Sequence, residues 1–96
     1  MSVLTFNQAV EAAKETRAAF DANDMRSIVN HNMALLRKME AQILEDGGEC
    51  NFHIPAYRWN IEQAIINRNG EGTMASAAYK YTESMQERMV NESGLV

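Results

Sequence analysis

Apolar residues recur at steps of three and four between residues 25 and 44, which predicts a long amphipathic helix. The stripe comprises Met25, Ile28, Val29, Leu35, Leu36, Met39 and Ile43. Asn32 falls on the same stripe, where the spacing favours an apolar side chain. A buried amide needs a hydrogen-bond partner, and a second copy of the helix can supply one through Asn–Asn contact. We therefore expect self-association through this face. Its residues are Met25, Ile28, Asn32, Leu35 and Met39.

A further amphipathic segment precedes this helix, at residues 5–20. Thr5 and Gln8 are spaced as a capping box, in which the Thr hydroxyl accepts from an amide of the first turn and the Gln side chain reaches back. The apolar side chains at helical spacing are Phe6, Val10, Ala13 and Phe20. We expect this helix to end in the polar run at 21–24, which also offers an N-cap to the next helix.

Two more helices are predicted after residue 54. Pro55 suits the first turn of a helix. The buried face of that helix would comprise Tyr57, Ile61, Ala64 and Ile65. Glycines within 69–72 end it, and Thr73 has the N-cap position of the last helix. The stripe of the last helix comprises Met74, Ala78, Tyr81, Met85 and Met89, and Gly94 ends it.

Residues 49–55 are the one stretch whose pattern does not predict a helix. Polar and apolar residues alternate from Cys50 to Ile54, and a residue before proline favours extended geometry. Gly47 and Gly48 end the preceding helix. We therefore predict a single all-α domain over 1–96. It is a small bundle of about four helices, arranged as two helical hairpins joined by a short extended crossover.

The composition is that of a small soluble globular protein. Of the 96 residues, 46% are hydrophobic and 23% are charged, which excludes a disordered chain. The net charge of −4 disfavours binding to membrane surfaces and makes binding to nucleic acid an unfavoured function. A lone cysteine, no long apolar run and no signal-like start predict a cytoplasmic location. In size and charge alone, the chain resembles the small acidic helical accessory proteins of bacteriophages and mobile elements, which commonly bind a host machine stoichiometrically.

Few residues are arranged for catalysis or for metal binding. Cys50 and His53 have the spacing C-x-x-H, but a zinc site needs three or four protein ligands, and the other histidine is His31. No third residue is identifiable that would orient His53 as a base for a cysteine nucleophile. We therefore expect no catalytic residue, no metal and no cofactor, and interpret the pair as a loop cysteine and a solvent-edge histidine.

The segment at 68–73 contains the parts of an anion site. Arg68 ends one predicted helix, Gly70 and Gly72 precede the next, and Thr73 supplies a hydroxyl at its cap. Backbone amides and the positive end of a helix can meet phosphate oxygens there. The segment is no P-loop, because it lacks that pattern and contains Glu71. The alternative interpretation is a tight turn between two helices.

A candidate protein interface lies at the start of the third predicted helix. Trp59 points about 160° away from Ile61, since each helical residue turns by roughly 100°. Trp and Arg are enriched at binding hot spots, so we expect Arg58 and Trp59, with Phe52 in the crossover, to contact a partner protein. The alternative is that Trp59 covers the underside of the crossover together with Phe52 and Ile66.

Three classes of function fit these features. The first is a non-enzymatic protein-binding module, a homo-oligomer that acts stoichiometrically as inhibitor or adaptor of a larger protein machine. The second is a binder of a small phosphorylated ligand or nucleotide, through the Arg68–Thr73 turn. The third is a helical DNA-binding domain, although its basic residues do not cluster. We favour the first, because the core is thin, Asn32 interrupts an apolar stripe and no catalytic group is identifiable. Apolar faces rich in methionine agree with it, since they form adaptable binding surfaces, although filling the core is the more common use of methionine.

Overall fold

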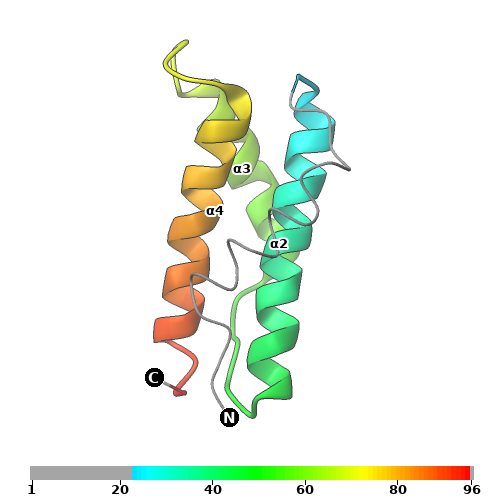
Figure 1. The fold of residues 1–96 in the computed structure, drawn as a ribbon, viewed down its shortest axis with the longest axis vertical. Helices are drawn as coiled ribbons and strands as arrows, with labels where there is room; N and C mark the ends of the chain where they lie inside the picture. The colour runs from blue at the N-terminus through cyan, green and yellow to red at the C-terminus, as the bar shows by residue number, and fades with distance from the viewer. Residues whose placement is uncertain (1–22, 96) are drawn as a thin grey trace.

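The computed structural model describes residues 23–95, which form three α-helices and one short 3₁₀ helix (Figure 1). These are α2 (Met25–Glu45), η1 (Ile54–Ala56), α3 (Tyr57–Ile66) and α4 (Met74–Asn91). Residues 23–95 contain no strand, so the all-α prediction is confirmed over this range. The helix expected at 5–20 lies outside the described residues, and the count of four helices stays a prediction.

Helices α2 and α4 lie side by side and run in the same direction, whereas α3 runs opposite to both (Figure 1). The Glu49 amide donates to the Ser93 carbonyl at 2.9 Å, which ties the chain after α2 to the chain after α4. The crossover therefore returns along the bundle before α3 begins. The turn after α3 then joins it to α4 as an antiparallel hairpin.

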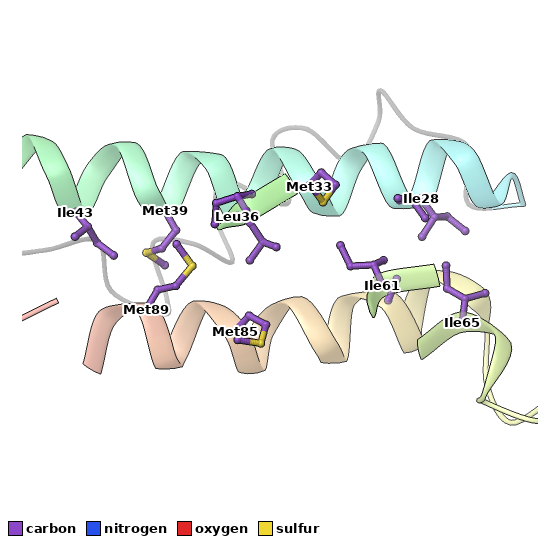
Figure 2. Packing of buried hydrophobic residues seen from close by; sticks show 12 residues of the cluster. Ile28, Met33, Leu36, Met39, Ile43, Ile61, Ile65, Met85 and Met89 are labelled. Carbon is purple, nitrogen blue, oxygen red and sulfur yellow. The ribbon is translucent and has the colours of Figure 1, made fainter. Parts of the chain in front are cut away.

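The core lies between α2, α3 and α4, where the predicted apolar stripes meet. Figure 2 shows Met39 and Met89 facing each other between α2 and α4, and Ile28 lying towards Ile61 and Ile65 of α3. All five are at most 2% exposed. Burying such a side chain is worth roughly 1.5–3 kcal/mol. Unbranched methionines suit this seam, because their flexible thioethers fill irregular gaps between helices.

The starts of α2 and α4 match the residues that the sequence indicates, whereas Pro55, predicted for the first turn of the third helix, lies in η1, and α3 begins at Tyr57. The Asp24 carboxylate accepts a hydrogen bond of 3.1 Å from the Arg26 amide at the start of α2. The Thr73 hydroxyl accepts one of 3.0 Å from the Ser76 amide at the start of α4. Each bond satisfies one of the amides that a helix leaves free in its first turn. Over the described range, no helix is long and apolar enough to cross a membrane.

Two adjacent glycines close α2 for different reasons. Gly47 has a φ of +85°, a left-handed conformation that glycine adopts without strain. At Gly48 the constraint is space, since an added Cβ would lie 2.6 Å from Cδ1 of Leu95. The second glycine therefore lets the end of the chain pack against the end of α2.

Candidate functional site

Helix α3 carries apolar side chains on two opposite faces. The inward face holds Ile61 and Ile65, both buried, with Tyr57 half-buried beside them. On the opposite side, Trp59 is 64% exposed and Ile66 is 58% exposed. Residues seven apart lie two turns apart on the same side of a helix, so these two side chains share one face. Two large apolar side chains are therefore presented to solvent on a helix whose opposite side packs into the core.

Arg58, directly before Trp59 in the first turn of α3, is exposed as well, and the helical step places it at the edge of this side, about 100° around the axis from Trp59. We call Arg58, Trp59 and Ile66 the outer face of α3. The outward direction of Trp59 agrees with the helical spacing. The alternative interpretation, in which Trp59 and Ile66 cover the crossover, does not fit side chains that are more than half exposed.

Phe52, the third residue of the predicted interface, has different surroundings. Its half-buried ring packs against the core, with its centroid 6.1 Å from that of Tyr57. The Arg88 guanidinium lies 5.5 Å from the Phe52 centroid, within the range of a cation–π contact. The Tyr57 ring is in turn 6.3 Å from that of Tyr81. Phe52 thus packs with aromatic residues that join the crossover, α3 and α4, whereas Trp59 is mostly exposed.

The stripe predicted to mediate self-association lies inside the single chain. Ile28, Asn32, Leu35 and Met39 are at most 2% exposed, and Met25 is half-buried. The Asn32 Nδ2 donates a hydrogen bond of 2.8 Å to the carbonyl of Ile28, one turn earlier in α2. A second copy could reach this face only if the chain opened. Self-association itself stays a prediction.

Among residues 23–95, three buried side-chain oxygens on α2 and α4 have no hydrogen-bond partner. They are Oδ1 of Asn32, Oγ1 of Thr82 and Oε1 of Gln86, in side chains at most 2% exposed. The sequence analysis did not single out Thr82 or Gln86. Their spacing could have predicted their burial, because both follow the buried Ala78 at steps of four along α4.

A cleft of about 540 Å³ lies between the end of α3, the following turn and α4. Of the four residues predicted to bind an anion, Arg68 lines it. The Thr73 hydroxyl is occupied by the cap of α4, and Gly70 and Gly72 have φ values of +78° and +69° in the turn. Lys80, twelve residues beyond Arg68, joins it in the lining. Anion binding by these residues stays a prediction, and Arg68 is the one of the four that lines the cleft.

The Cys50 and His53 pair lies in the crossover. Cys50 is a free, half-buried thiol packed against the core, and His53 is exposed as the residue before η1. Within residues 23–95, no group of three or more Cys, His, Asp or Glu side chains is placed to hold a metal ion.

No protein-family model matches this chain, and it has no match among curated proteins or solved structures.

Proposed function

We propose that this chain is a non-enzymatic protein-binding module, which acts stoichiometrically as an inhibitor or adaptor of a larger protein. Its contact surface is the outer face of α3. The observation that carries the proposal is the exposure of Trp59 and Ile66, at 64% and 58%, on a helix whose opposite face already fills the core. Neither side chain belongs to the core that residues 23–95 form, so both are available to a partner.

The chemistry of the outer face defines the partner that it fits. Trp59 and Ile66 lie about 10 Å apart along the helix axis, at 1.5 Å per residue. A partner with an apolar groove would receive both from one short helix, a common mode of helix recognition. Arg58 at the edge favours a groove with an acidic rim, because charge complementarity selects partners and speeds their encounter.

The outer face alone is smaller than a standard interface of about 1,600 Å², so neighbouring residues must contribute area. The binding free energy, in contrast, is concentrated in a few central side chains that insert into pockets of the partner. Truncating a buried Trp anchor typically costs at least about 2 kcal/mol of binding, or roughly 30-fold in Kd. Presenting this face requires no second copy of the chain.

Self-association remains a separate part of the proposal. The Asn32 face is buried within one chain, so a homo-oligomer would have to use another surface. The outer face could serve in that role only at the expense of binding the partner, since both would cover Trp59.

A capture experiment with matched baits tests the proposed surface. The immobilised proteins are the native chain, Trp59→Ala, Ile66→Ala and Leu44→Ala. Leu44→Ala is the control, because Leu44 is a large apolar residue on a different helix, α2, with a similar exposure of 55%. We expect a protein that binds the native and Leu44→Ala baits and is lost from the two α3 baits. Equal capture by all four baits would contradict the proposal, as would unfolding of Trp59→Ala.

A further inference from the structure

We infer that the cleft between α3 and α4 binds a small phosphorylated molecule, with Arg68 and Lys80 on its phosphate group. This site is separate from the outer face of α3, and its existence does not depend on the protein-binding function. The two basic residues come from different segments, one from the turn after α3 and the other from α4, and both line the same cleft.

The balance of charge in the cleft differs from that of the whole chain. The protein has a net charge of −4, whereas the cleft combines Arg68 and Lys80 with one carboxylate, Glu71. Within residues 23–95, neither cation makes an ion pair, although Arg88 and Glu92 approach to 3.8 Å on the surface of α4. Two cations that make no ion pair, set against one carboxylate, attract an anion into a partly enclosed space.

Arg68 is held in position before any ligand arrives. Its Nη1 donates a hydrogen bond of 2.8 Å to the carbonyl of Ile65, at the end of α3. Its Nε is buried and has no acceptor among the described residues. A guanidinium fixed in this way loses little freedom on binding, and its remaining charge is poorly compensated by the protein. Both properties favour a nearby anion.

Helix α4 forms the other wall of the cleft with two rows of side chains at steps of four. One row is polar and comprises Ser76, Lys80 and Ser84. The next row comprises Ala77 and Tyr81, and Ala64 of α3 lies across from it. The polar row offers an ammonium flanked by hydroxyl donors, which suits phosphate oxygens. The small and aromatic row leaves room for the body of the ligand.

The site favours a phosphate monoester over a polyphosphate. Two cations match the charge of one phosphate dianion, and Glu71 repels further phosphate groups. Burial raises the pKa of Tyr81, against the opposing effect of its hydrogen bond with Asn60. Its hydroxyl is therefore protonated at neutral pH and adds no negative charge to the cleft.

Titrations followed by amide NMR test this site, with inorganic phosphate, ribose 5-phosphate and adenosine 5′-monophosphate as separate probes. We expect saturable shifts around Arg68, Ser76 and Lys80 at roughly millimolar ligand or below. Phosphate alone should bind more weakly than the esters if the apolar row contacts the ligand body.

Charge variants give the decisive comparison. Lys80→Gln should weaken binding by about tenfold or more, since it removes one partner of a charge pair. Glu71→Gln should tighten it, and Lys38→Gln, an exposed lysine on α2, is the matched control. All three positions are exposed, so folding is preserved. Absence of saturation with every probe, or equal losses in Lys80→Gln and Lys38→Gln, would overturn the inference.

Discussion

The Nε2 atom of Gln86 donates a hydrogen bond of 3.5 Å to the carbonyl of Leu35, across 51 positions of the sequence. This contact joins α4 to α2 near the middle of the bundle, and both residues are 2% exposed. The bond is long, and Oε1 of the same side chain has no partner. A buried polar group in this state contributes specificity of packing at the expense of stability.

Replacing Gln86 with leucine should therefore stabilise the protein. Gln86→Leu removes a half-satisfied amide and keeps a side chain of similar length, so we expect a gain of roughly 1 kcal/mol in the free energy of unfolding. Gln42→Leu is the control. Gln42 is half-buried, and its Nε2 donates a hydrogen bond of 3.1 Å to Oδ1 of Asp46, so this substitution removes an amide that has a partner. Urea denaturation measures both. A loss of stability in Gln86→Leu would show that its amide bond outweighs the unpaired oxygen.

Asn32→Leu separates packing within the chain from pairing between chains. Because Asn32 is buried with Oδ1 unpaired, the substitution should raise the melting temperature of the chain. Sedimentation of the native protein and the variant reports the oligomeric state in parallel. If α2 pairs with a copy of itself, the variant will also change the distribution of oligomers. An unchanged distribution together with higher stability indicates that Asn32 acts within one chain.

Alkaline pH should weaken the fold through Tyr81. Burial raises the pKa of its hydroxyl above the ordinary value of 10.0, which describes the unfolded chain. As the pH rises past 10.0, the unfolded state loses this proton first, so the stability associated with Tyr81 falls until the folded-state pKa is passed. Tyr81→Phe should lose less stability than the native chain over this range. Parallel pH profiles of unfolding for the two proteins would contradict this assignment.

Local patterns were sufficient to predict most of the described helices. The caps Asp24 and Thr73 and the glycines after α2 depend on a few neighbouring residues, and all lie where the sequence indicates. The outward direction of Trp59 likewise follows from the helical step and the inward position of Ile61. Such features need no knowledge of the tertiary fold.

Contacts between distant segments were not predictable in the same way. The spacing places Asn32 on a buried face, but it does not say whether the chain itself or a second copy buries it. Arg68 and Lys80 share a cleft because α3 and α4 form a hairpin, which depends on how the helices pack. The Gln86 contact with Leu35 depends on α2 and α4 running side by side in the same direction.

The most direct test of the proposed function is the accessibility of Trp59, the single tryptophan of the chain, to a soluble fluorescence quencher. In the free protein the quencher should reach the indole readily, since the side chain is 64% exposed. After the captured partner is added to saturation, we predict that quenching falls severalfold and that the emission shifts to the blue. Unchanged quenching in a complex whose formation is verified by sedimentation would contradict the claim that the outer face of α3 is the binding surface.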